Sequence, residues 1–271
     1  MSHINGPLYA EVMGPVDAPT MVFVHPNPMD NSCWMYQLAH FSTWFRCIAI
    51  DLPGYGRSPS AEEGLTMEEI ADACWAAVDR ITDSVPAVLV GCSVGSNVVQ
   101  HMYHRRPEST DSVIVCGTGY SPNKEFAPRR IAAYQEQGID YRYDYTLQDL
   151  SPEFGATPLA GWLATLFTER NDQADLPTII RMFEALGIPD PEWLQRELNA
   201  PVLIISGSLD TAHATAPALL ERLPDGEMFT IEGAGHACQI ERPWTFDAEM
   251  IRFLRAHGHD RLPAVWELVA E

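Results

Sequence analysis

The segment at residues 91–95 reads GCSVG and places one serine, Ser93, between two glycines. It directly follows an apolar run at 87–90, and from Val94 onward apolar residues recur with the spacing of a helix. A strand, a tight turn and a helix in this order hold a serine on a strained turn, and the flanking glycines let the two elements approach closely. The pattern predicts that Ser93 is a nucleophile at the carboxyl edge of a sheet and at the positive end of a helix.

Two further residues fit the roles that a nucleophilic serine requires. A serine hydroxyl needs a base within hydrogen-bond reach, and that base needs a group that orients it. His236 ends the glycine-rich segment 233–236 (GAGH), just after the last strand-like run, and we expect it to be the base. Asp210 follows the preceding strand-like run, and we expect it to hold the imidazole in the correct tautomer and to stabilise the imidazolium.

Other histidines and aspartates compete for these roles. Four histidines lie near strand ends or on the helix after Ser93: His25, His101, His104 and His213. None of them has the glycine-rich turn that precedes His236, so we interpret them as structural or exposed. Asp51 follows an earlier strand in a loop that we interpret as structural, whereas Asp30 lies in the first loop and is a candidate for substrate contact.

The elements that position these residues follow from the hydrophobic patterning. Near-continuous apolar runs predict buried strands of a parallel sheet at residues 20–24, 47–50, 87–90, 112–116, 201–206 and 227–231. Between the second and third of these runs, Thr66 and Glu69 form a capping box ahead of one apolar helical face that extends to Ile81. Strands that alternate with helices predict a doubly wound α/β fold.

Residues 120–198 break this alternation. They contain no convincing strand, and their helical patterns lie at 128–137, 158–169, 175–186 and 191–198. We therefore expect residues 1–119 and 199–271 to form the sheet domain that carries Ser93, Asp210 and His236, and residues 120–198 to form an inserted helical cap. A final helix is expected at 241–255 and a short one at 264–269.

Two loops beside these elements carry a family resemblance that covers nearly the whole chain. Residues 51–58 (DLPGYGRS) look like the D-x-x-G-x-G-x-S loop of the α/β-hydrolase superfamily, and residues 25–28 (HPNP) stand where that family usually has His-Gly-x-Pro. The order Ser93, Asp210, His236 also matches the family order of nucleophile, acid and histidine. The resemblance is to the capped, serine-nucleophile branch, which includes esterases, lactonases and carbon–carbon bond hydrolases.

The resemblance implies an eight-stranded, mostly parallel sheet, a helical cap over the active site and an oxyanion hole. The main-chain N–H groups of Asn27 and Val94 would form that hole. Pro26 departs from the usual glycine of the family, yet Pro26 and Pro28 have no N–H, so Asn27 carries the only main-chain donor between residues 26 and 28. A serine nucleophile also argues against the dehalogenase and epoxide hydrolase branches, which use aspartate.

The composition narrows the classes of partner. The chain has 271 residues, 46% of them hydrophobic, and a formal net charge of −20, with 37 acidic against 17 basic residues. Nucleic acids and anionic membranes require basic patches, so we expect neither as a partner. No leader segment or apolar membrane span is visible, and six cysteines without a CxxC pair are expected to be reduced, which favours a cytoplasmic location. We expect no metal and no cofactor, and a homo-oligomer is left open.

The aromatic residues of the expected cap indicate an apolar pocket for a small-molecule substrate. Trp162 and Phe167 are the candidates to line it together with Asp30, and Arg129 and Arg130 are interpreted as a solvated surface pair. The leading hypothesis is a hydrolase that cleaves a small, largely apolar or aromatic carboxylic ester or lactone through an acyl-enzyme. The alternatives are hydrolysis of a carbon–carbon bond in a diketone-type substrate, lyase or cofactor-free oxygenase chemistry, and a ligand receptor that retains the fold.

Overall fold

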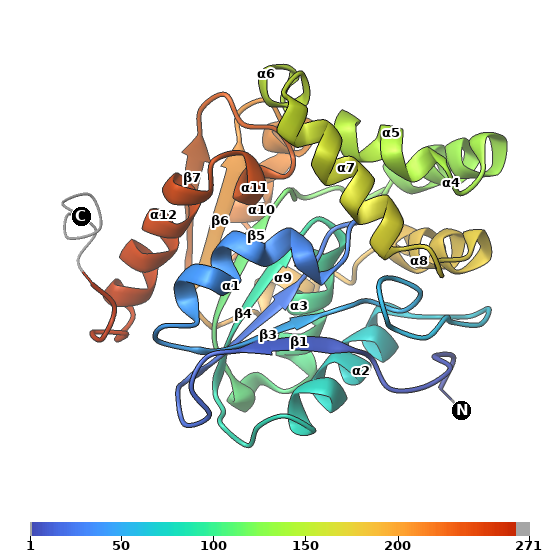
Figure 1. Ribbon diagram of the computed structural model, residues 1–271. Helices are drawn as coiled ribbons and strands as arrows, with labels where there is room; N and C mark the ends of the chain where they lie inside the picture. The colour runs from blue at the N-terminus through green and yellow to red at the C-terminus, as the bar shows by residue number, and fades with distance from the viewer. Residues whose placement is uncertain (1, 264–271) are drawn as a thin grey trace.

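A seven-stranded sheet forms the centre of the computed structural model, which describes residues 2–263 (Figure 1). The strands lie in the order β1-β3-β2-β4-β5-β6-β7, with β1 antiparallel to β3 and the other neighbouring pairs parallel. Their bounds are β1 Ala10–Met13, β2 Thr20–Val24, β3 Arg46–Ile50, β4 Ala87–Cys92, β5 Thr110–Cys116, β6 Val202–Gly207 and β7 Gly226–Ile231. The helix expected at 264–269 lies outside the described residues.

The described sheet has one strand fewer than the eight that the resemblance implies. Residues 2–9 precede β1 and contribute one isolated bridge, between Ile4 and Ala61. Gly6 and Pro7 interrupt this segment, because Gly6 has a φ of 150° and Pro7 has no N–H to donate to a neighbouring strand. A further strand therefore does not form at this edge, and β1 is the edge strand.

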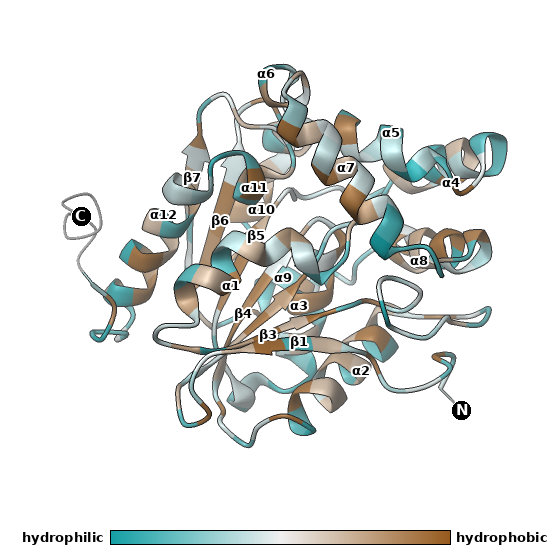
Figure 2. Cartoon of the chain, viewed as in Figure 1, coloured by the Kyte–Doolittle hydropathy of each residue, from teal (hydrophilic) through white to brown (hydrophobic). Residues whose placement is uncertain are grey.

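Alternating side chains of the strands bury both faces of the sheet. Val22 and Val24 of β2 belong to one hydrophobic cluster, and Met21 and Phe23 belong to another on the opposite face. The first cluster is covered by α2 (Met67–Asp79), α3 (Val94–Arg105) and α10 (Ala216–Leu220), and the second by α1 (Met35–Phe41), α11 (Cys238–Glu241) and α12 (Pro243–Ala256). Figure 2 shows the hydrophobic residues along the central strands.

Helix α2 begins at the capping box that its sequence predicts. The Thr66 hydroxyl accepts a hydrogen bond from the Glu69 N–H at 3.2 Å, and the Glu69 carboxylate accepts one from the Thr66 N–H at 3.2 Å. Two of the N–H groups that have no partner within the helix are thereby satisfied. The apolar face of α2 then packs beside α3, the helix that starts at the predicted nucleophile.

The chain between β5 and β6 is helical and lies over the carboxyl ends of the parallel strands (Figure 1). Its helices are α4 (Phe126–Gln137), α5 (Tyr141–Gln148), α6 (Pro152–Gly155), α7 (Pro158–Arg170), α8 (Leu176–Gly187) and α9 (Trp193–Arg196). Ser151, Thr157 and Asp175 cap the N-termini of α6, α7 and α8, and each of these helices has proline in its first turn. Helix α4 packs against α8, and α5 packs against α7.

Two further properties of residues 2–263 concern membranes and thiols. Across this range, no helix combines the length and the apolar composition that crossing a bilayer requires. All six cysteines of the chain are buried and carry free thiols: Cys33, Cys47, Cys74, Cys92, Cys116 and Cys238. They pack as small apolar side chains in the two clusters.

Candidate active site

Ser93 occupies a sharp turn between β4 and α3. Its backbone has φ 55° and ψ −118°, a region that side-chain-bearing residues rarely adopt. The two flanking glycines are required by space: a Cβ on Gly91 would lie 2.3 Å from the Gly95 carbonyl oxygen, and one on Gly95 would lie 2.1 Å from the Val24 carbonyl oxygen. The Ser93 N–H donates to the Cys116 carbonyl oxygen at 2.9 Å, which ties the turn to the end of β5.

The carboxyl ends of β6 and β7 bring Asp210 and His236 together. His236 Nδ1 donates to Asp210 Oδ1 at 3.0 Å, and the same oxygen accepts the Ala212 N–H at 2.9 Å. The imidazole lies over the end of β5: a Cβ on Gly117, the residue after this strand, would be 3.1 Å from His236 Cε1. Gly117 has φ +58°, so both its backbone and the space above it favour glycine.

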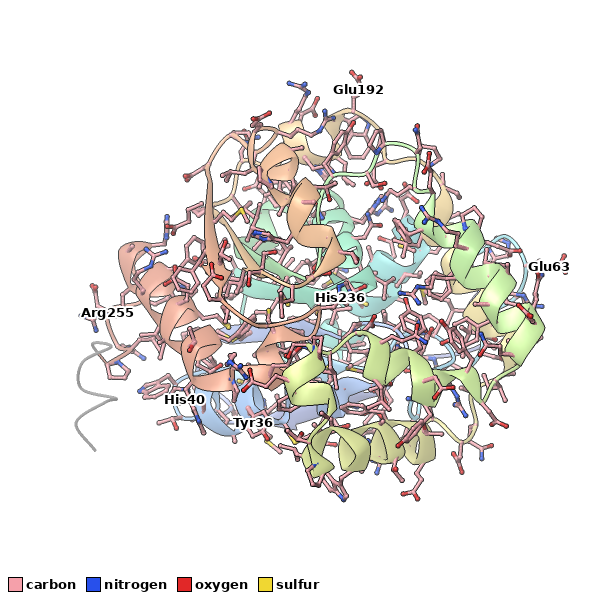
Figure 3. The ribbon with its side chains drawn as sticks, turned by 90° about the horizontal axis from the view of Figure 1, so that it is seen from above. Tyr36, His40, Glu63, Glu192, His236 and Arg255 are labelled. Atoms are coloured by element: carbon pink, nitrogen blue, oxygen red, sulfur yellow. The ribbon has the colours of Figure 1, made fainter. Side chains whose placement is uncertain are left out.

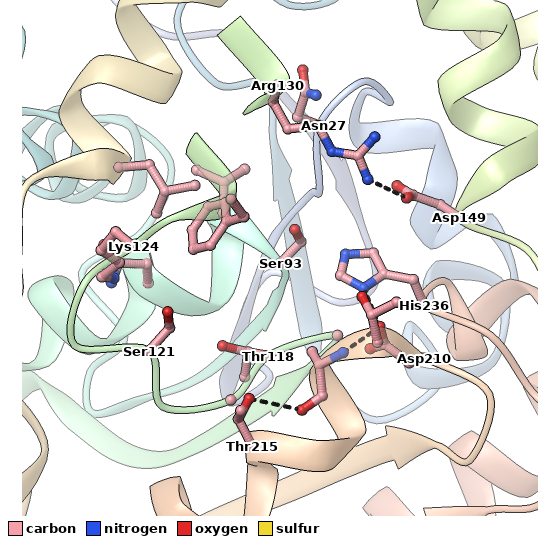
Figure 4. A pocket seen from close by; sticks show the side chains of 18 of the residues that line it. Asn27, Ser93, Thr118, Ser121, Lys124, Arg130, Asp149, Asp210, Thr215 and His236 are labelled. Atoms are coloured by element: carbon pink, nitrogen blue, oxygen red, sulfur yellow. Dashed lines mark hydrogen bonds and ion pairs between the residues drawn. The ribbon is translucent and has the colours of Figure 1, made fainter. Parts of the chain in front are cut away.

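A cavity of about 390 Å³ opens at this edge of the sheet (Figure 4). Ser93, His236 and Asp210 line it together with Asn27 and Val94, so the structure gathers these five sequence-derived candidates in one place. Within the described chain no direct hydrogen bond joins Ser93 to His236. Catalytic hydrogen bonds are often long before a substrate binds, so this geometry is compatible with proton transfer between the two side chains.

The turn that carries His236 is held by the helical segment between β5 and β6 (residues 120–198) as well as by the sheet. The His236 N–H donates to the Asp149 carbonyl oxygen at 2.8 Å. Glu241 Oε1 accepts the Gly235 N–H at 2.9 Å and the Ser151 N–H at 3.0 Å, so one buried carboxylate bridges the histidine turn and the start of α6. His236 consequently lies where these elements meet, near the middle of the view from above in Figure 3.

Two carboxylates act on His236. Burial alone would lower its pKa, but the charges of Asp149 and Asp210 and the hydrogen bond to Asp210 raise the pKa to about 10. Burial raises the pKa of Asp149 to about 6, although His236 and Arg130 oppose this. Burial also favours the neutral form of Asp210, yet the charge of His236 and the hydrogen bonds from His236 and the Ala212 N–H together outweigh it and hold the pKa of Asp210 below its ordinary value. The site thus stabilises an imidazolium.

Both polar atoms of the Asn27 side chain form hydrogen bonds. Its Oδ1 accepts the Tyr55 hydroxyl, and its Nδ2 donates to the Tyr134 hydroxyl at 3.5 Å. By contrast, the main-chain N–H groups of Asn27 and Val94 donate to no acceptor among residues 2–263. Both residues line the cavity, so these two N–H groups are available to an oxygen bound there.

His25 and Asp51, two of the rival residues, have structural roles. His25 Nδ1 donates to the Pro26 carbonyl oxygen at 2.8 Å, and its Nε2 accepts the Leu52 N–H at 2.9 Å. Asp51 accepts the N–H groups of Asn31 and Arg57. Neither these two residues nor the other three rival histidines line the cavity.

Comparison with known proteins places this geometry in a family. A model described as "Alpha/beta hydrolase family" matches residues 21–246. The chain belongs to the alpha/beta hydrolase family. It is 27% identical to the dihydrolipoyllysine-residue acetyltransferase component of the acetoin cleaving system from Pseudomonas putida, over 88% of this chain but 64% of that relative, so it spans less than two thirds of that protein.

Two other relatives match along most of their length. The chain is 25% identical to the pimeloyl-[acyl-carrier protein] methyl ester esterase of Chromobacterium violaceum, over 92% of this chain and 97% of the relative. The crystal structure of the enol-lactonase from Burkholderia xenovorans LB400 superposes with a TM-score of 0.81 at 21% identity, covering 93% of this chain and 98% of that one. The alpha/beta hydrolase fold predicted from the sequence is thereby confirmed.

Three residues that the sequence suggested for substrate contact do not line the cavity of this alpha/beta hydrolase. Asp30 is buried, accepts the Ser32 N–H at 2.8 Å and pairs with Arg170 at 2.9 Å, so it joins the first loop to α7. Trp162 lies on the outer face of α7 and is 56% exposed, whereas Phe167 on the same helix packs in the hydrophobic cluster beneath. Aromatic character alone did not distinguish these environments.

The lining of the cavity is more polar than the sequence indicated. Arg130 is not a solvated surface residue: it lies over the Tyr145 ring, pairs with Asp149 at 3.8 Å and lines the cavity, as does Lys124 (Figure 4). Further polar lining residues are Asn97, Gln100, Gln148, Asp190 and Gln195. No local motif marks these residues, because the packing of the helical segment and of α3 around the cavity decides which side chains reach it.

Proposed function

We propose that this alpha/beta hydrolase cleaves a carboxylic ester or a lactone through an acyl-enzyme on Ser93. The observation that carries the proposal is the convergence of Ser93, on its strained turn, with the His236–Asp210 pair in one cavity. The nucleophile, the base and the group that orients the base come from three different strand ends. Such a convergence is the arrangement that acyl transfer by a serine requires.

The chemistry proceeds in two halves. His236 accepts the proton of the Ser93 hydroxyl as its oxygen attacks the carbonyl carbon, and Asp210 stabilises the imidazolium that forms. Collapse of the tetrahedral intermediate breaks the bond to the alcohol oxygen, which takes the proton from His236. Water then gives a proton to His236 and attacks the acyl carbon, which releases the acid and restores Ser93. In a lactone the alcohol and the acid leave as one molecule.

The negative oxygen of each tetrahedral intermediate needs hydrogen-bond donors. We propose that the main-chain N–H groups of Asn27 and Val94 supply them, since neither has another acceptor within residues 2–263 and both residues line the cavity. The N-terminus of α3 adds a favourable dipole, because Val94 is its first residue.

We propose that the helical segment from 120 to 198 acts as the cap of this site. Its residues Arg130, Asp149 and Phe183 line the cavity opposite the strand ends. A cavity of about 390 Å³ is suited to a small substrate. Similarity to a methyl ester esterase supports an ester as the substrate class.

A substrate panel combined with active-site labelling tests the proposal. Aryl esters, cyclic lactones and a vinylogous diketone are offered to the wild-type protein and to Ser93→Ala. We expect hydrolysis of esters or lactones by the wild type and a loss on the order of 10⁶-fold in kcat in Ser93→Ala. A fluorophosphonate should label Ser93, as mass spectrometry of the digested protein would show.

Ser121 provides a matched control, because it is a second serine that lines the same cavity. Ser121→Ala should remain labelled by the fluorophosphonate, whereas Ser93→Ala should not. Wild-type rates in folded Ser93→Ala would contradict the assignment of the nucleophile. Turnover of the diketone without turnover of any ester or lactone would favour carbon–carbon bond hydrolysis instead.

A further inference from the structure

Each charged side chain that lines the cavity has an ionic partner that also lines it. The pairs are Lys124–Asp190 at 2.7 Å, His236–Asp210 at 3.0 Å, Arg130–Asp149 at 3.8 Å and Arg129–Glu125 at 3.8 Å. Arg129 and Glu125 are exposed to solvent, but the other three pairs are largely buried. Beside those three pairs, a charged ligand would have to displace one partner or stay unpaired away from water, and both outcomes are costly. The charges of the cavity therefore favour a neutral ligand.

Three buried amides, Asn97, Gln100 and Gln195, line the cavity and form what we call the amide cluster. Their side chains come from α3 and α9, and the residues are 6%, 4% and 2% exposed. Asn97 Nδ2 donates to Asp190 Oδ1 at 3.1 Å, and Gln195 Nε2 donates to Gln100 Oε1 at 3.3 Å. Gln100 Nε2 donates to the Ser96 carbonyl oxygen at 2.9 Å, so the cluster is held in place by its own contacts.

Among residues 2–263, one fully buried polar atom of the amide cluster has no partner. Gln195 Oε1 is buried and accepts no hydrogen bond from the described part of the chain. Buried polar atoms in proteins are nearly always paired, so each exception calls for an explanation. Gln195 lines the cavity, so a small turn of its side chain would present this buried oxygen to a hydrogen-bond donor on a bound ligand.

The amide cluster is separated from the reacting centre. Asn97 and Gln100 follow Ser93 by four and seven residues on α3, which corresponds to about 6 and about 10 Å along the helix axis. A substrate with its carbonyl at Ser93 would therefore reach the amide cluster with a different part of its structure. That part would meet groups that both donate and accept hydrogen bonds.

We propose that the amide cluster is a specificity subsite for a neutral hydrogen-bonding group, a carboxamide or a hydroxyl, on the substrate. The inference rests on the proposed hydrolysis at Ser93 and adds the substrate class. A site that hydrogen-bonds a substrate group rejects an analogue that lacks it, because its own buried polar atoms then stay unpaired. This subsite implies a substrate with a polar group, whereas the aromatic content of the helical segment suggested a largely apolar substrate.

A matched set of esters tests the subsite. Aryl esters carry acyl arms of equal length that end in a carboxamide, an isopropyl group or a carboxylate, and a second series carries these end groups on the alcohol arm. Arm length is varied in both series. Hydrolysis by the wild type gives kcat/KM, and calorimetry with Ser93→Ala, which cannot form the acyl-enzyme, gives Kd. We expect the carboxamide to exceed the isopropyl analogue at least about tenfold in one series, with the carboxylate weakest.

Gln195→Leu replaces the amide by an apolar group of similar size. We expect it to abolish the preference, so that the ratio of kcat/KM for the carboxamide ester to that for the isopropyl ester falls to about one. A merely structural role of Gln195 would lower both rates together. Gln135→Leu, at an exposed position of α4, is the matched control and should preserve the carboxamide preference.

The two proposals fail in different ways. Equal kcat/KM and equal Kd for all three end groups in both series would overturn the subsite, and so would a preference for the carboxylate. Carboxamide-selective binding to Ser93→Ala without hydrolysis of any ester by the wild type would contradict the proposed function but support the subsite.

Discussion

The sheet and the helical segment between β5 and β6 each give His236 a carboxylate, but the two carboxylates act differently. Asp210, from the end of β6, accepts the Nδ1 proton at 3.0 Å and therefore orients the ring. Asp149, from the end of α5, holds the main chain of His236 through its carbonyl oxygen, while its carboxylate acts on the ring through charge. Both carboxylates thus raise the proton affinity of His236, but only the one from the sheet also fixes the direction of its ring.

The largest effect in this comparison is expected from the sheet side. Asp210→Asn removes the acceptor that selects the imidazole tautomer, so kcat should fall on the order of 10⁴-fold in folded protein. Steady-state kinetics with the best ester, together with circular dichroism to confirm folding, would measure this. A far greater loss in Asp51→Asn or Asp30→Asn, with the fold intact, would show that Asp210 is not the carboxylate that orients His236.

The next effect concerns the junction between the two regions. Glu241→Leu leaves the N–H groups of Gly235 and Ser151 without their acceptor, so the free energy of unfolding should fall by about 2 kcal/mol or more. A misplaced His236 should also lower kcat roughly 10²-fold. Denaturant unfolding and kinetics test both.

Glu241→Gln is the matched control for this junction, because it keeps the Oε1 acceptor. It should retain most of the stability and of the activity. Equal losses in Glu241→Gln and Glu241→Leu would show that the charge of Glu241, rather than the bridge between the two N–H groups, is what matters.

A smaller effect, with a defined direction, is expected from the helical side. The Asp149 carboxylate stabilises the imidazolium, so Asp149→Asn should lower the pKa of His236 from about 10, by roughly one unit or more. Because only neutral His236 can accept the Ser93 proton, the acid limb of kcat/KM against pH should move to lower pH. Activity near neutral pH should rise accordingly.

Asp190→Asn is the control for this shift, since Asp190 lines the cavity but pairs with Lys124 rather than with His236. Its acid limb should stay at the wild-type position. An unmoved limb in Asp149→Asn would contradict the role that we assign to that carboxylate.

The smallest effect on catalysis is expected at Asn27. Asn27→Ala keeps the main-chain N–H, so kcat should stay within about tenfold of the wild type. Loss of the contacts to the Tyr55 and Tyr134 hydroxyls should lower the free energy of unfolding by about 1–2 kcal/mol. A drop in kcat of about 10²-fold or more with unchanged stability would instead assign the oxyanion contact to the side chain.

The same two regions differ in how far sequence predicts them. The six apolar runs correspond to β2 through β7, because strands buried on both faces need continuous apolar residues. The sequence does not predict strand β1, because this strand is four residues long and partly exposed and therefore shows no continuous apolar run. The sequence does not predict helix α5 either, because Tyr141–Gln148 is short and polar. Its aromatic residues contact other helices, and such contacts cannot be seen in the local sequence pattern.

The side chains that line the cavity also differ in how well the sequence predicts them. Ser93 and His236 lie in glycine-rich turns whose geometry is local, so sequence could point to both. Arg130 and Gln195 reach the cavity only because of how α4 and α9 pack, and that packing depends on contacts far apart in the chain. Periodicity separates the inner from the outer face of a helix, but it does not tell which inner residues meet an open space.

The bridge formed by Glu241 and the contact of His236 with the Asp149 carbonyl oxygen also bear on the timing of turnover. Any outward movement of residues 149–151 to admit a ligand would break the hydrogen bonds that hold the histidine turn. Access and reactivity would then be alternative states of one equilibrium: the open form exchanges ligands without an aligned base, and the closed form reacts without exchanging. Each turnover would then include an opening and a closing step besides bond cleavage.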